Sequence, residues 1–165
     1  MASIAFTDCS GVNPIQGSSQ PAPRRREVVI NGRRVKTVDV HAHCVIPETL
    51  TMLGLKPDAQ RRGLVMVVAD RVSEMDAQGI DVEALSINPF WYKAERDLAT
   101  QVIRIQNEKL AELCAARPDR FVAFASVALQ YPDLAVQQLE DGVKKLGLRG
   151  AAVGASVAGD EFSDP

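Results

Sequence analysis

Hydrophobic positions along this 165-residue chain fall into two alternating patterns, short apolar runs and longer helical stripes. The apolar runs are rich in β-branched or small residues and predict strands at 28–30, 37–41, 82–87, 121–127 and 150–154. Segments with an apolar residue at every third or fourth position predict helices at 71–78, 98–116 and 133–146, with a helical turn near 48–53. Alternation of strands and helices is typical of a parallel sheet with right-handed crossovers.

Turn and cap residues mark the ends of these elements. Asn31-Gly32 predicts a tight hairpin turn into the strand that follows. Gly79 and Gly147 stand where glycine ends a helix, and Asp133 is expected to cap the last helix at its start. Two apolar stripes are expected to be buried: Ala99, Val102, Ile103, Leu110, Leu113 and Cys114 in one helix, and Ala135, Leu139, Val143 and Leu146 in the other.

Composition narrows the class of protein. The chain is 46% hydrophobic with a net charge of −2, and no apolar run reaches the length of a membrane span or has the form of a secretory signal. Residues 1–27 show no apolar period and are predicted to be a disordered leader. Arg24, Arg25 and Arg26 suggest either a nucleic-acid arm or a solvated charge run, and the near-neutral charge favours the second. We therefore expect neither a nucleic-acid nor a membrane partner.

The three cysteines, Cys9, Cys44 and Cys114, are far apart in the sequence and form no C-x-x-C pair. Such spacing is not a disulfide framework and suits a reducing compartment. We expect a cytoplasmic protein.

His41-Ala42-His43 is the most informative motif. Strand residues two apart point to the same face, about 6.6 Å apart along the backbone, so two imidazoles can converge on one cation. These are the only two histidines, and chance places two histidines at this separation in about one chain of eighty. Both follow the first long strand at its carboxyl end, where barrel enzymes build their active sites. The pattern predicts that His41 and His43 are metal ligands.

Two neighbours of this motif have open roles. Asp39 shares the face of the histidines, so it is either a partner that fixes an imidazole tautomer or a satisfied polar residue of the strand. Cys44 points to the opposite face, which predicts a packed thiol rather than a ligand.

Several short motifs together resemble one enzyme family. The segment 38–48 resembles the opening of amidohydrolase-related enzymes, and the nearest branch is the aminocarboxymuconate-semialdehyde decarboxylase-like group. The resemblance continues, in the same order and spacing, through 74–81, 84–86, 118–121, 134–135 and 146–150. It covers about residues 36 to 165.

The resemblance implies an α/β fold, a TIM (β/α)8 barrel, of which residues 28–165 form the N-terminal half, about the first four βα units. A complete barrel takes roughly 250 residues. The family holds one divalent metal between the two histidines of the first strand and ligands on later strands, and uses a further histidine as acid/base. We expect zinc, with manganese as the other candidate, and a decarboxylase or hydrolase of a small carboxylate substrate. No catalytic residue is assigned within the chain, because the later strands are not part of it.

The loop after the strand at 82–87 carries three aromatic residues, Phe90-Trp91-Tyr92. Trp91 and Tyr92 are predicted to line the substrate pocket, and the alternative is that they plug the barrel rim. Arg61, Arg62 and Arg71 occupy the stretch in which this branch keeps a carboxylate-binding arginine. None of them aligns cleanly, so each is interpreted as a solvated arginine.

Three functional hypotheses follow. The first is a metal-dependent carboxy-lyase or hydrolase, represented here by a partial chain that is inactive alone. A phosphoesterase barrel that also begins with His-x-His is disfavoured by the absence of further histidines. A non-catalytic half-barrel remnant that acts only by association with another chain is the third. The open sheet edges of half a barrel also predict self-association. Four apolar residues that would face the interior of a closed barrel are expected to lose part of their burial: Val40, Leu85, Val122 and Phe124.

Overall fold

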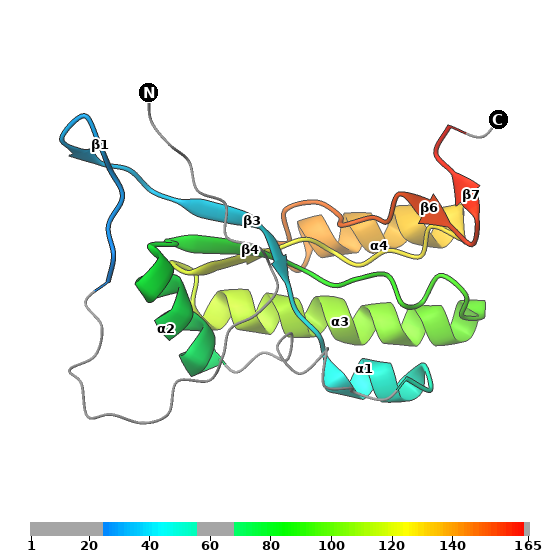
Figure 1. The fold of residues 1–165 in the computed structure, drawn as a ribbon. Coiled ribbons are helices and arrows are strands. Elements are labelled where there is room, and N and C mark those ends of the chain that lie inside the picture. The colour runs from blue at the N-terminus through cyan, green and yellow to red at the C-terminus, as the bar shows by residue number, and fades with distance from the viewer. Residues whose placement is uncertain (1–24, 56–67, 164–165) are drawn as a thin grey trace.

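A parallel three-stranded sheet lies at the centre of the computed structural model, which describes residues 25–55 and 68–163 (Figure 1). The sheet has the order β3-β4-β5 and consists of β3 (Val38–His43), β4 (Val82–Ser86) and β5 (Phe121–Ala123). The helices are α1 (Pro47–Met52), α2 (Val68–Gln78), α3 (Arg96–Ala116) and α4 (Pro132–Lys144). Most of the expected leader, residues 1–24, lies outside the described residues.

Two small antiparallel hairpins flank this unit. The first joins β1 (Val29–Ile30) to β2 (Arg33–Arg34), and the second joins β6 (Ser156–Val157) to β7 (Asp160–Glu161). The first hairpin confirms the turn predicted at Asn31-Gly32, whose φ angles of 51° and 75° are those of a type I′ turn. No helix in the described ranges is long and apolar enough to cross a membrane.

The predicted alternation of strands and helices is confirmed, with one weaker element. The segment expected as a strand at 150–154 joins the sheet through a single parallel bridge, Ala125 to Ala151. The Ala125 N–H donates to the Gly150 carbonyl at 2.8 Å, and the Ala152 N–H donates to the Ala125 carbonyl at 3.0 Å. Four parallel segments therefore lie side by side, although the described residues do not form a closed barrel.

Glycine ends α2 as the sequence predicts. Gly79 has φ 80°, and its N–H donates to the Asp76 carbonyl at 3.3 Å while the Ile80 N–H donates to the Met75 carbonyl at 2.8 Å. These two bonds form a Schellman motif, which requires the left-handed conformation that glycine adopts without strain.

The hydrophobic core lies on the side of the sheet that faces α3. Ala99, Val102, Ile103 and Leu110 of the predicted stripe are fully buried there, whereas Leu113 and Cys114 are half-buried. Leu85 is also fully buried, because it pairs with Ala42 and faces this core, so the expectation that it points inward to an open barrel is wrong. The same expectation agrees with the exposure of Val40, which is 70% exposed, and Val122 and Phe124 are half-buried.

Helix α4 packs through a different face from the predicted one. Leu134, Ala135 and Gly142 are buried, whereas Leu139 and Val143 are exposed. The helix approaches the sheet at Gly142, where an added Cβ would lie 3.0 Å from the Cβ of Ala125, so the closest contact is made by a residue without a side chain. The apolar stripe missed this because glycine contributes nothing to a hydrophobic pattern.

The start of α4 also differs from the prediction. Asp133 is not the N-cap: that position belongs to Tyr131, which makes no side-chain cap bond, and Pro132 takes the first helical position. Proline suits this position because its missing N–H would have no helical partner there. Asp133 instead pairs with Arg96 at the surface.

Asp81 connects the first hairpin to the amino end of the sheet. Its side chain is buried and accepts hydrogen bonds from the guanidinium groups of Arg25 and Arg34 and from the Thr37 backbone N–H at 2.8 Å. Arg25 is therefore an ion-pair partner, and the interpretation of that residue as part of a solvated charge run is wrong. The hydrogen bond from Thr37, together with Arg34 and Arg25, lowers the pKa of Asp81.

We expect Asp81→Asn to lower the free energy of unfolding by about 2 kcal/mol, because it weakens charge-assisted hydrogen bonds to a buried group. A carboxyl whose pKa is depressed in the folded state contributes stability above its ordinary pKa of about 3.9. That stability is lost as the pH falls through the folded-state pKa, so the difference between wild type and Asp81→Asn should shrink in acid. Urea unfolding across this pH range measures both effects.

The matched control is Asp133→Asn, because that carboxylate pairs with Arg96 at the surface, with both side chains about half exposed or more. Its loss should be clearly smaller than that of Asp81→Asn, because exposed ion pairs contribute little to stability. Equal losses in the two variants would contradict the role assigned to Asp81.

Candidate metal centre

His41 and His43 lie together at the carboxyl end of β3. Their Nε2 atoms are 3.0 Å apart, and the rings meet edge to face with centroids 4.8 Å apart. His41 is exposed and His43 is half-buried. The two nitrogens converge as the alternation of strand side chains predicts.

The pairing of β3 with β4 decides which side chains meet the histidines. His43 pairs with Ser86 and Ala42 pairs with Leu85, whereas the register shifts between Asp39 and Ala42. A shift of this kind adds a residue to one strand and re-aims the side chains on either side of it. The Cys44 N–H donates to the Ser86 carbonyl at 2.8 Å and fixes the register immediately beyond the histidines.

Ser86 is the immediate neighbour of the His43 ring. Its Oγ lies 3.0 Å from Nδ1 of His43, on the side of the ring opposite the Nε2 atom that approaches His41. Burial lowers the pKa of His43 and the adjacent His41 lowers it further, while a hydrogen bond with the Ser86 backbone acts in the opposite direction. The net shift favours a neutral ring, which is the form that binds a metal.

Arg71 of α2 contacts the backbone at the same end of β3. One guanidinium nitrogen donates to the His43 carbonyl at 3.0 Å, and Nε forms an ion pair with the buried carboxylate of Glu83. Burial raises the pKa of Glu83, although Arg71 opposes that shift. The interpretation of Arg71 as a solvated arginine is wrong, because its side chain is only 14% exposed. Arg61 and Arg62 lie outside the described residues.

Asp39 and Cys44 have structural roles. Asp39 accepts the backbone N–H of His41 at 2.9 Å, so of the two roles left open for it the structure supports the satisfied polar residue. Cys44 is buried, and burial raises the pKa of its thiol to about 12, which keeps it protonated. A protonated thiol is not a metal ligand. The packed role predicted for Cys44 is therefore confirmed.

The donor set fits two positions of a metal site. Two imidazole nitrogens bound to one tetrahedral zinc at 2.0–2.1 Å lie about 3.3 Å apart, close to the 3.0 Å between these Nε2 atoms. In the described part of the chain, no group of three or more His, Cys, Asp or Glu residues is placed to hold a metal. The two imidazoles therefore fit two of the four positions of a tetrahedral site, which would need two more ligands.

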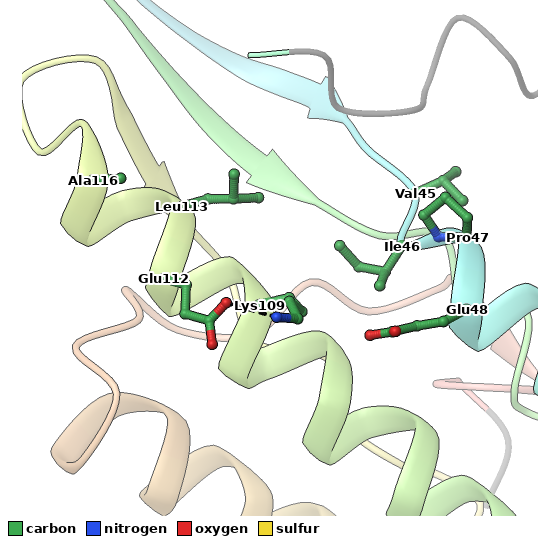
Figure 2. Close-up of a pocket in the computed structure, with 8 residues that line it drawn as sticks. All are labelled: Val45, Ile46, Pro47, Glu48, Lys109, Glu112, Leu113 and Ala116. Atoms are coloured by element: carbon green, nitrogen blue, oxygen red, sulfur yellow. Dashed lines mark hydrogen bonds and ion pairs between the residues drawn. The ribbon is translucent and has the colours of Figure 1, made fainter.

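A surface groove lies elsewhere. It has a volume of about 690 Å³ and is formed where α1 meets α3, with Val45, Ile46 and Pro47 on one wall and Lys109, Glu112 and Leu113 on the other. Figure 2 shows Glu48 and Lys109 projecting into the space between the two helices. Neither histidine lines this groove, so it is separate from the candidate centre.

Trp91 and Tyr92, the predicted substrate-binding residues, pack in the core. Trp91 is fully buried, and its indole N–H donates to the Val127 carbonyl at 2.9 Å. Tyr92 is 8% exposed, and its hydroxyl oxygen accepts the Gly154 N–H at 3.1 Å. This placement suits the packing role given as the alternative, and a contact with substrate stays a prediction.

Sequence reasoning missed Ser86, which contacts His43, and Glu83, which contacts Arg71. Glu83 gives a signal in hindsight, because a carboxylate inside the apolar run 82–87 needs a buried partner. Ser86 can be recognised as a neighbour of His43 only after β3 and β4 are aligned, since the contact depends on their register.

Comparisons with known proteins identify the family. Residues 38–165 match the profile of the amidohydrolase family, and the chain belongs to that family. The resemblance to amidohydrolase-related decarboxylases is thereby confirmed.

Its relatives include decarboxylases. The chain is 42% identical over 132 residues to gamma-resorcylate decarboxylase of Rhizobium radiobacter, with 74% of this chain and 40% of the relative covered. It is 29% identical over 97 residues to 2-amino-3-carboxymuconate-6-semialdehyde decarboxylase of Dictyostelium discoideum, and this match covers 58% of this chain and 27% of the relative. The chain thus spans well under half the length of these relatives.

A solved structure agrees with the observed fold. Dihydroxybenzoic acid decarboxylase of a Polaromonas species, with bound manganese and the inhibitor 2-nitroresorcinol, has a TM-score of 0.63 and 34% identity to this chain. The likeness covers 73% of this chain and 38% of that one.

We expect Trp91→Phe to lower the free energy of unfolding by about 1–3 kcal/mol, because it leaves the buried Val127 carbonyl without its donor. Metal affinity should stay unchanged, since Trp91 contacts neither histidine in the hydrogen bonds described. Denaturant unfolding and metal titration of the same variant separate the two roles. Weaker metal binding at unchanged stability would show that Trp91 belongs to the site.

Proposed function

We propose that this chain provides the metal-binding strand of a metal-dependent carboxy-lyase that acts on a small aromatic or conjugated carboxylate. The observation that carries the proposal is the convergence of the His41 and His43 Nε2 atoms at 3.0 Å. The decarboxylases among its relatives favour this enzyme over a non-catalytic half-barrel remnant. The substrate class follows from the resorcylate and the inhibitor named for those relatives.

In this proposal His41 and His43 are the first two ligands of a divalent metal. Manganese is supported by the Polaromonas enzyme, and zinc remains compatible with imidazole ligands. When bound, such a metal acts as a Lewis acid that orients and polarises a carboxylate-bearing substrate. Metal occupancy requires the lone pair of each Nε2, and the lowered pKa of His43 keeps its ring neutral near pH 7.

The chain's own residues carry the binding and positioning steps. Ser86 orients the His43 ring, and Arg71 with Glu83 holds the backbone at the end of β3. Cys44 stays on the helix side as a protonated thiol. We assign no proton-transfer group to this chain, so the 165 residues alone should bind metal without turning over substrate. In this proposal the chain is the first half of a TIM barrel, and the remaining ligands and the acid/base group lie on the later strands of the complete barrel.

We also propose that the chain associates with other copies through the free edge of its sheet. Among the described residues β3 is an edge strand of the sheet, and Val38 and Val40 are 51% and 70% exposed on it. An open edge with exposed apolar residues presents unpaired backbone groups to another chain.

The metal proposal predicts measurable binding by the chain and its loss in either histidine variant. Wild type should bind Mn²⁺ or Zn²⁺ weakly, because only two ligands are present, whereas His41→Ala and His43→Ala should each reduce binding below detection. Isothermal calorimetry with both ions measures this. Cys44→Ala is the control and should bind as wild type does; unchanged binding in the double histidine variant would refute the site.

The edge proposal predicts self-association that depends on β3. Size-exclusion chromatography with light scattering should find species larger than a monomer, and Val38→Lys with Val40→Lys should shift them towards monomer, because lysine on an edge strand opposes pairing. Val29→Lys is a matched control, since Val29 is 56% exposed on the separate hairpin. A monodisperse wild-type monomer with a sharp thermal transition would contradict the proposal.

A further inference from the structure

The two histidines are held differently, although they belong to one motif. His43 is half-buried and touches Ser86 at Nδ1, whereas His41 is exposed and its only hydrogen-bonded ring contact among the described residues is with His43. The environment of the two rings therefore differs on the side away from the shared Nε2 contact.

The Ser86 side of His43 is rich in acceptors. The Ser86 carbonyl points towards the end of β3, because it accepts the Cys44 N–H at 2.8 Å. The serine hydroxyl lies 3.0 Å from Nδ1 of His43, and a hydroxyl accepts from a protonated ring nitrogen or donates to an unprotonated one. In the proposed site the metal takes the Nε2 lone pair, so the ligating form of the neutral ring carries its proton on Nδ1 and the Ser86 hydroxyl accepts that proton.

This ligating tautomer of His43 has a consequence for the shared contact. With Nδ1 of His43 protonated, the neutral ring keeps its lone pair on Nε2. At 3.0 Å one Nε2 donates and the other accepts, so in that state His41 would be the donor, with its proton on Nε2. A metal needs the lone pairs of both Nε2 atoms. In this arrangement His43 would already have the tautomer that a metal requires, whereas His41 would have to move its proton to Nδ1.

From this geometry we infer that Ser86 is a positioning residue, which holds His43 as the preformed ligand while His41 is the ligand that adapts on metal binding. The inference rests on the proposed metal site and adds to it the order in which its two ligands are prepared. Hydrogen-bond partners of ligating histidines typically contribute about 10- to 100-fold in metal affinity.

The fold supplies a matched control. Ser126 follows β5, the strand next to β4, and its side chain is buried like that of Ser86. Its hydroxyl has no hydrogen-bond partner among the described residues, and its backbone is held by Asn107 instead. Removing this hydroxyl should leave both histidines unaffected.

The first measurement is a long-range ¹H–¹⁵N correlation spectrum of the metal-free wild-type chain. Only two histidines occur in the sequence, so His41→Ala assigns the remaining ring without ambiguity. We expect the Nδ1–H tautomer for His43 and the Nε2–H tautomer for His41. An Nε2–H tautomer of His43 in the wild type would overturn the inference, and this result needs no variant to fold.

The second measurement is a calorimetric titration of the wild type, Ser86→Ala, Ser86→Thr and Ser126→Ala with Mn²⁺ and Zn²⁺. Ser86→Ala should lose about 10- to 100-fold in affinity and move His43 towards the Nε2–H tautomer. Ser86→Thr, which keeps the hydroxyl, and Ser126→Ala should behave as wild type. Unchanged affinity in Ser86→Ala, or an equal loss in Ser126→Ala, would overturn the inference. If the wild type binds neither ion, the proposed metal site fails, while the tautomer spectra still decide the role of Ser86.

Discussion

The parallel pairing of β3 with β4 is the interaction on which the candidate centre depends. Strand side chains alternate between faces, so a slip of one residue would turn His41 and His43 towards the helices and bring Cys44 to their place. The bond from the Cys44 N–H to the Ser86 carbonyl and the pairing of Ala42 with Leu85 prevent that slip. Burial of Leu85 against α3 reinforces the register, since a slip would also expose this side chain.

Buried polar side chains of α3 form hydrogen bonds with the segments that follow β3 and β5. Gln106 donates to the Thr49 hydroxyl at 3.2 Å, which connects α3 to α1 just after the histidine strand. Asn107 makes two hydrogen bonds to the Ser126 backbone, at 2.8 and 3.0 Å, and holds the end of β5. Polar groups in a core stabilise one arrangement when they are paired, because any other arrangement leaves them unsatisfied. The helix thus anchors the carboxyl ends of two strands, and Figure 1 shows it running along the sheet.

Local chemistry explains which features were predictable from sequence. The Asn31-Gly32 turn, the glycine that ends α2 and the first four positions of the α3 stripe depend on neighbours in the chain, and each is found where it was expected. The convergence of His41 and His43 likewise follows from strand periodicity alone.

Features that depend on contacts between distant segments were missed. Arg71 becomes an ion-pair partner only because α2 crosses the sheet beside Glu83, twelve residues away in the chain. Arg25 is recruited by Asp81 across an even longer separation. The buried face of α4 is set by close approach at Gly142, which a hydrophobic pattern does not register. Ser86 reaches His43 through the register of two strands, which no single segment encodes.

X-ray absorption spectroscopy of the zinc-loaded chain tests the central claim most directly, because it reports the atoms bound to the metal. Two imidazole ligands with Zn–N distances of about 2.0–2.1 Å are predicted, with the remaining positions filled by oxygen donors from solvent. Loss of the imidazole signal in His41→Ala with His43→Ala should accompany loss of zinc. A first shell containing sulfur, or one without imidazole, would contradict the assignment of His41 and His43 as the metal-binding pair.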